Sequence, residues 1–133
     1  MNHHLMKKLS TFVLFLFMSY NTLHAQQESK QIVRLAKLVI DSVQLKNYNA
    51  FLKEGIEEAV KQEPGVLTLY AVAEKKNPTH ITILEIYADE QAYKNHIQTP
   101  HFLKYKNGTK AMVKSLELID TVPLIPDMKI KSR

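Results

Sequence analysis

Residues 85–105 of this 133-residue chain read EIYADEQAYKNHIQTPHFLKY, and this stretch decides how the other segments are interpreted. It begins as the end of an alternating strand. Asp89 can then cap a short helix, which ends by Gln98 because a residue before proline is pushed out of the α region. Thr99 can cap a second helix, with Pro100 at the first position, where its missing N–H costs nothing. The pattern predicts a strand followed by two helices that meet at a corner.

Two histidines flank this corner. His96 ends the first predicted helix and His101 lies in the first turn of the second, so both imidazoles could point into the same space. We take both as candidate catalytic residues. Each also has a plainer interpretation, in which His96 is an exposed cation at the negative end of a helix dipole and His101 only packs behind Pro100.

Glu85 and Tyr87 lie on one face of the preceding strand, because side chains alternate along a strand. Glu85 could orient a neighbouring imidazole, and Tyr87 could donate a hydrogen bond to an oxyanion. Both residues therefore join the candidate catalytic set. The alternative for Glu85 is an edge charge that discourages aggregation.

A substrate pocket next to these polar groups would need an apolar wall. The sequence offers four aromatic side chains and one methionine for this wall: Phe51, Tyr70, Phe102, Tyr105 and Met112. The tyrosines have an alternative role in half-buried packing, since tyrosine commonly buries its ring and keeps its hydroxyl wet.

The other segments supply the remaining elements of one domain. A β-branched run predicts a strand over residues 31–41, and an apolar stripe at helical spacing predicts a helix over 43–62. Strands are expected over 66–74 and 79–87, joined by a hairpin loop at 75–78. A helix over 100–115 and a strand over 116–122 complete the order. This order predicts an α+β fold with the ferredoxin-like split βαβ plan, a four-stranded antiparallel sheet with helices on one face.

The predicted strands are apolar on both faces. In the third strand, Ile81 and Ile83 point to one side while Leu84 and Ile86 point to the other. Helices can cover only one of these faces. The pattern therefore predicts a homodimer in which a second copy of the chain covers the other face.

The first 25 residues have the features of a secretory signal peptide. Lys7 and Lys8 precede an apolar core at residues 12–18, and Ala25 supplies the small residue before the cut. An uncleaved anchor is the alternative, but the apolar run is shorter than the ~20 residues of a bilayer span. We expect a periplasmic or secreted protein, with a loose segment at 26–30, a domain at 31–123 and a tail at 124–133.

Composition narrows the possible partners. The chain has no cysteine, which excludes disulfides and thiolate metal sites. Removal of the leader would leave 16 basic against 13 acidic residues, and no basic stripe with interleaved aromatics is present. We therefore expect no nucleic-acid partner and no stable membrane insertion after cleavage of the signal.

Several of these features together resemble the antibiotic biosynthesis monooxygenase family over residues 31–123. The resemblance rests on Glu85-x-Tyr87, Ala92, His96, Thr99-Pro100-His101-Phe102, the turn Glu63-Pro64-Gly65 and the strand with Tyr70. It implies a small dimeric α+β barrel of the kind found in quinol and anthrone oxygenases, which work without a cofactor. A facial metal triad of His96, His101 and Glu85 is conceivable but is not expected, because the family works without metal. The haem-degrading branch matches poorly at His96 and Lys106.

The resemblance leaves three functional classes open. The first is a cofactor-independent monooxygenase of a small quinol or phenol, in which His96 or His101 is the base and the other histidine with Tyr87 holds the oxyanion. The second is an isomerase of a small dicarbonyl, because a relative with a similar Thr-Pro-His corner is an isomerase that acts on a phosphorylated signalling sugar derivative. The third is a small-molecule binding protein that has kept the fold without the chemistry.

Overall fold

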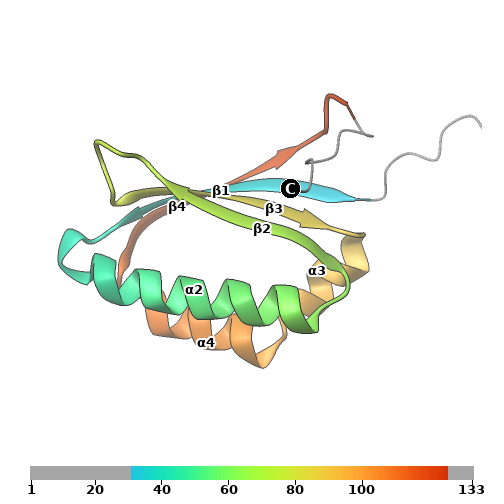
Figure 1. Ribbon diagram of the computed structural model, residues 1–133, viewed down its shortest axis with the longest axis horizontal. Coiled ribbons are helices and arrows are strands. Elements are labelled where there is room, and N and C mark those ends of the chain that lie inside the picture. The colour runs from blue at the N-terminus through green and yellow to red at the C-terminus, as the bar shows by residue number, and fades with distance from the viewer. Residues whose placement is uncertain (1–30, 126–133) are drawn as a thin grey trace, which may run out of the picture.

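The computed structural model describes residues 31–125, in which four antiparallel strands form one sheet and the helices lie on one side of it (Figure 1). The elements are β1 (Ile32–Ile40), η1 (Ser42–Gln44), α2 (Leu45–Gln62), β2 (Val66–Ala73), β3 (His80–Tyr87), α3 (Glu90–His96), α4 (Pro100–Thr109) and β4 (Val113–Thr121). The strand order is β2-β3-β1-β4. The predicted α+β, ferredoxin-like class is confirmed. The predicted leader, the segment 26–30 and most of the predicted tail lie outside the described residues.

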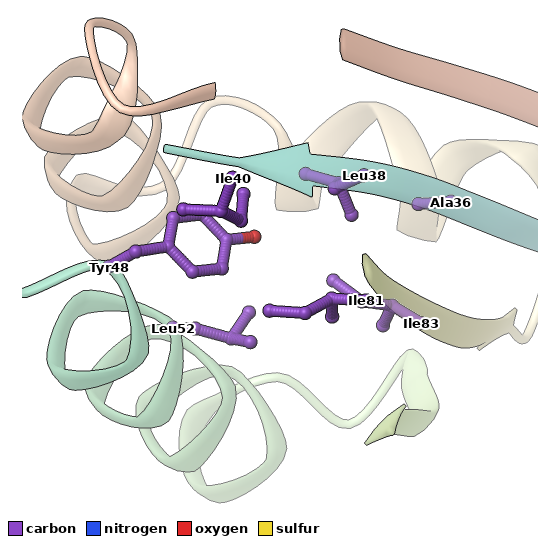
Figure 2. Close-up of a cluster of buried hydrophobic side chains, with 7 residues drawn as sticks. All are labelled: Ala36, Leu38, Ile40, Tyr48, Leu52, Ile81 and Ile83. Carbon is purple, nitrogen blue, oxygen red and sulfur yellow. The ribbon is translucent and has the colours of Figure 1, made fainter. Parts of the chain in front are cut away.

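The apolar core lies between the sheet and α2. Its buried side chains come from β1, β3 and α2, and Figure 2 shows them pointing toward one another: Ala36, Leu38, Ile40, Tyr48, Leu52, Ile81 and Ile83. Tyr48 is fully buried there, and its hydroxyl lies 2.7 Å from the hydroxyl of Tyr105 on α4. The buried tyrosine thus keeps a polar partner, which removes the desolvation penalty of an unpaired hydroxyl.

Helix α4 is shorter than the sequence analysis predicts. It ends at Thr109 rather than at residue 115, and β4 begins at Val113. The Thr109 hydroxyl donates to the carbonyl of Tyr105 at the end of the helix. The Met112 amide then donates to the carbonyl of Thr109, which forms the turn that leads into β4. The apolar side chains after residue 109 follow a strand in the structure, so the helical period assigned to them was wrong.

Gly108 brings α4 close to α2. A Cβ atom at this position would lie 2.4 Å from Cε1 of Phe51, so a larger residue would have to displace the Phe51 ring. The cost of about 1 kcal/mol that glycine imposes inside a helix is therefore offset by close packing.

The turn after α2 fixes the direction of the chain. Glu63 takes an extended conformation because Pro64 follows it, and the helix ends there. The Val66 amide then bonds to the carbonyl of Glu63, and the Ala88 amide bonds to the carbonyl of Gly65. A Cβ atom at Gly65 would lie 2.5 Å from the Cβ of Ala92, so glycine also lets α3 pack against this turn.

The face of the sheet away from the helices has apolar side chains that nothing covers within residues 31–125. Tyr70 is 65% exposed and Val72 is 48% exposed. Val33, Leu35, Val39, Leu84 and Ile86 on the same face are half-buried. We call these residues the open sheet face.

Within residues 31–125, none of the helices has the length and apolar character needed to cross a bilayer.

Candidate functional site

A cavity of about 290 Å³ lies between the sheet and the helices. Most of its wall is apolar, and the polar side chains come from β1, β3, α3 and α4: Arg34, Glu85, Tyr87, Tyr93, His96, Tyr105 and Lys106. Known ligand sites commonly range from ~300 to 1,000 Å³, so this cavity would suit a small molecule.

A row of charged residues crosses the sheet at one level. Arg34 on β1 stands opposite Glu85 on β3 and opposite Asp120 on β4. The Arg34 Nε donates to Oδ1 of Asp120 at 2.8 Å, and the guanidinium carbon lies 4.6 Å from the centroid of the Tyr93 ring. The cavity wall therefore carries a permanent cation, Arg34, next to the carboxyl group of Glu85.

Glu85 is the carboxyl group of this wall. The Tyr87 hydroxyl donates to its Oε2 at 3.0 Å. Burial raises the pKa of Glu85, while the Tyr87 hydrogen bond and the nearby Arg34 and His96 act in the opposite direction without cancelling the effect of burial. The raised pKa keeps a proton on Glu85 at a higher pH than on an exposed glutamate.

Tyr87 acts as a donor in this pair. Burial, followed by the Glu85 charge, raises the pKa of its hydroxyl far above the ordinary value. Burial also raises the pKa of Tyr105, another tyrosine on the cavity wall. Both phenols therefore stay protonated near neutral pH and can donate hydrogen bonds rather than abstract protons.

The two histidines of the corner meet at a single carboxylate oxygen. His96 Nδ1 lies 2.8 Å and His101 Nε2 lies 2.6 Å from Oε2 of Glu63, the last residue before Pro64. All three side chains are largely buried, with exposed fractions of 7%, 11% and 13% for His96, His101 and Glu63. The helix caps explain this meeting, because Thr99 bonds both to the His96 carbonyl and to the Phe102 amide and so fixes the angle between α3 and α4.

Only one of these two histidines lines the cavity. His96 is part of its wall, whereas His101 and Glu63 are not. The His96 ring packs between the rings of Tyr87 and Phe102, with centroid distances of 5.4 and 5.0 Å. If its Nδ1–H donates to Glu63, its Nε2 is left with a free lone pair, so the ring can accept a proton at that atom.

The same three side chains are the ones that could hold a metal ion. Their ligand atoms lie within 4.8 Å of one another, and they form the one such group among residues 31–125. The cluster already satisfies itself as a carboxylate with two imidazole donors. The triad weighed in the sequence analysis, with Glu85 as the acid, does not form, because Glu85 pairs with Tyr87.

The predicted pocket residues separate into two groups. Phe102 and Tyr105 line the cavity. Phe51 and Met112 instead border a separate hollow between α2 and α4, and Tyr70 lies on the open sheet face. The position of Phe51 follows from its packing against Gly108, and that of Tyr70 from strand alternation, which turns its neighbours Leu69 and Ala71 toward the helices.

Sequence reasoning missed four polar residues of the site: Glu63 at the corner, and Arg34, Tyr93 and Lys106 on the cavity wall. Glu63 was interpreted only as part of a turn, and the structure shows it as the carboxylate that holds the imidazoles. Glu85, for which the sequence left open a role in orienting an imidazole or one as an edge charge, hydrogen-bonds to Tyr87 instead of to a histidine. A partial signal for Arg34 was present, because antiparallel pairing could have placed a basic residue of the first strand opposite Glu85.

Comparison with known proteins gives a consistent family. The family model described as antibiotic biosynthesis monooxygenase matches residues 32–108. A crystal structure from Bacteroides thetaiotaomicron, of a protein provisionally named an antibiotic biosynthesis monooxygenase, is 63% identical, with a TM-score of 0.75, over 76% of this chain and 96% of that chain. No curated protein matches the sequence.

Two more distant structures have the same fold. A provisionally named monooxygenase from Lactobacillus acidophilus is 26% identical with a TM-score of 0.69, over 71% of this chain and 45% of that chain. A provisionally named antibiotic biosynthesis monooxygenase from Nitrosomonas europaea is 15% identical with a TM-score of 0.69, over 76% of this chain and 97% of that chain.

Proposed function

The chain belongs to the antibiotic biosynthesis monooxygenase family, and from this premise we propose that it oxidises a small quinol or phenol with dioxygen as the only other reactant. The main support for the proposal is the environment of His96. It combines a place on the wall of an apolar cavity with a carboxylate that fixes its tautomer.

The reaction has a definite balance. A quinol loses two hydrogen atoms and gains one oxygen atom from dioxygen, and the second oxygen atom leaves as water. The substrate supplies all the electrons. The protein must therefore remove a phenolic proton, so that the electron-rich anion can pass an electron to dioxygen, and must keep water away from the radical pair.

His96 suits the first task. Its Nε2 accepts the phenolic proton, and the Glu63 carboxylate stabilises the imidazolium that forms. The ordinary pKa of histidine, about 6.5, lies close to a neutral working pH. Tyr87 lies against the His96 ring and stays protonated, so its hydroxyl can donate to the substrate oxygen once it leaves Glu85. His101 acts as a positioning residue, because it reaches His96 only through Glu63.

Oxygen uptake with a panel of quinols and phenols tests the proposal. We expect turnover in the wild type and a loss of ~10²- to 10⁴-fold in His96→Ala, because a true base contributes about that much. Added imidazole should restore part of this loss. His80→Ala is the matched control, since His80 is an exposed histidine at the start of β3.

Three other outcomes would redirect the assignment. Full activity in both His96→Ala and His101→Ala on an identified substrate would reduce the histidines to structural caps. Conversion of a small dicarbonyl without oxygen uptake would favour the isomerase. A shift of melting temperature with a ligand, but no turnover, would favour a binding protein.

We further infer that the chain acts as an exported homodimer. The open sheet face presents Tyr70 and Val72 with the half-buried Leu84 and Ile86, and a second copy of the same face would cover them. Light scattering should show a dimer at micromolar concentration, and Leu84→Glu should shift it to a monomer. A wild-type monomer would contradict the inference. The predicted leader supports export, and detection of the protein in a periplasmic or culture fraction would test it.

A further inference from the structure

Arg34 is a cation on the cavity wall that the proposed chemistry does not use. Its side chain is 14% exposed and it projects from β1 on the face that carries the cavity. Because arginine stays protonated at any working pH, this part of the wall carries a permanent positive charge.

The guanidinium is held by one exposed carboxylate and by one ring of the cavity wall. Its Nε donates to Asp120, whose side chain is 79% exposed, and its carbon stands over the Tyr93 ring at 4.6 Å from the centroid. An exposed carboxylate is screened by water, so it neutralises little of the charge on the cavity side. The bond to Asp120 uses Nε, and Tyr93 is a further polar neighbour of the guanidinium, so remaining donors of the terminal Nη groups can bind another partner.

The rest of the wall adds to this positive character. Lys106 also lines the cavity, with its Nζ 5.8 Å from the centroid of the Phe102 ring. The acidic residue on the wall, Glu85, already accepts the Tyr87 hydroxyl and stands opposite Arg34 in the sheet. The remaining wall is largely aliphatic. A matching ligand would have an apolar body and an anionic group of its own.

We propose that Arg34 binds a carboxylate of the substrate through its terminal Nη groups, so that the cavity selects a small aromatic acid over a neutral molecule of the same shape. The planar guanidinium matches a carboxylate with two parallel hydrogen bonds, which a point charge such as lysine cannot reproduce. A volume of about 290 Å³ suits a small ligand. The inference rests on the proposed function only in that both use the same cavity.

Binding can be tested without turnover. Calorimetric titration of the wild type with para-hydroxybenzoate and with para-hydroxybenzamide compares two ligands that differ in charge but hardly in shape. We expect the acid to bind ~10- to 100-fold more tightly, because hydrogen bonds to a charged group increase a binding constant by about this factor. Arg34→Gln should abolish this preference and leave the weaker affinity for the amide unchanged. Arg34→Lys should restore only part of it.

Two further variants serve as controls: Lys37→Gln on the opposite face of β1, and Lys106→Gln at the other cation of the cavity wall. Lys37→Gln removes an exposed cation from the same strand but from the opposite face, so it should keep the full preference. The inference is overturned if the wild type binds both probes equally or neither of them. It is also overturned if Arg34→Gln keeps the preference, or if Lys106→Gln alone abolishes it.

The wild-type comparison stands even if an Arg34 variant fails to fold. A preference for the acid without oxygen uptake would support this inference while contradicting the proposed oxygenation. Oxygen uptake with neutral quinols, combined with equal binding of the two probes, would give the opposite result. The two proposals can therefore fail separately.

Discussion

Two half-buried carboxyl groups, Glu63 and Glu85, lie in neighbouring regions of the molecule and have different surroundings. At the helix corner, Glu63 accepts from two imidazoles at a single oxygen. On the cavity wall, Glu85 accepts from one hydroxyl and faces Arg34 across the strands. Burial raises the pKa of Glu85. The carboxylate at the corner is committed to two hydrogen-bond partners, whereas burial of the carboxyl group on the wall favours its protonated form.

The two carboxyl groups therefore have different roles: Glu63 positions His96, and Glu85 belongs to the surface that a ligand contacts. The corner ties the end of α2 to α3 and α4 and so fixes the orientation of His96. The wall presents the groups that a ligand would meet. Changes to Glu63 should therefore act on stability and geometry as well as on His96, and changes to Glu85 or Tyr87 mainly on pH dependence and ligand preference.

Replacing Glu63 should have the largest effect on stability. Glu63→Ala leaves two buried imidazoles without their acceptor, and we expect a loss of about 3 kcal/mol in the free energy of unfolding. Urea unfolding at one fixed protein concentration measures this loss. Glu57→Ala is the matched control, because it removes an exposed ion pair with Lys53 on the same helix and should cost under about 0.5 kcal/mol. If Glu63→Ala and Glu57→Ala lost similar free energies of unfolding, the hydrogen bonds of Glu63 would contribute no more to stability than an exposed ion pair.

Tyr87→Phe should have an intermediate effect that depends on pH. The variant loses one buried hydrogen bond, about 1 kcal/mol at neutral pH. Because that bond lowers the pKa of Glu85, its loss should raise this pKa further. A raised carboxyl pKa in the folded state stabilises the fold below the ordinary value, about 4.3, and this stabilisation is lost as the pH rises through the folded pKa.

The decrease in stability should therefore extend to higher pH in Tyr87→Phe than in the wild type. Unfolding free energies measured between acidic and neutral pH would show this as a difference between the two proteins that grows with pH. In a Glu85→Gln background the same tyrosine substitution should lose its pH-dependent part. A difference that stays constant across the range would show that Tyr87 does not influence the ionisation of Glu85.

Asp120→Asn should have the smallest effect. The Asp120 side chain is 79% exposed, so its ion pair with Arg34 should contribute under about 0.5 kcal/mol. Thermal and urea unfolding in low and high salt would measure this contribution. A loss above about 1.5 kcal/mol in the free energy of unfolding would mean that Arg34 depends on Asp120 for its position. The cavity wall would then rely on a fixed ion pair, as the corner relies on Glu63.

The sequence was most informative where local rules act. Capping by Asp89 and Thr99, the position of Pro100 and the order of the elements follow from contacts within a few residues, and the structure confirms these. The two-sided apolar pattern also appears, as an open sheet face. The end of α4 was misjudged because apolar residues over 109–116 fit a helix and a strand equally well.

The site was harder to predict because its contacts connect distant positions. Glu63 meets its partners across 33 and 38 residues, and no local pattern indicates such a pairing. Tyr70 was assigned to the pocket because its strand is apolar on both faces, so alternation could not say which face is covered. Phe51 precedes Leu52, a core residue, by one position on α2, and this rotation turns it toward Gly108.

The position of β1 in the sheet has a consequence for how the chain folds. β1 comes first among the described strands, yet it lies inside the sheet, and its second partner is β4, with Arg34 and Asp120 separated by 86 residues. Contacts of such long sequence separation slow folding, because a large loop must close before they form. During synthesis, one edge of β1 keeps its backbone groups unpaired until nearly the whole domain exists. A nascent or truncated chain that ends before residue 113 would expose an apolar strand edge able to pair with other chains.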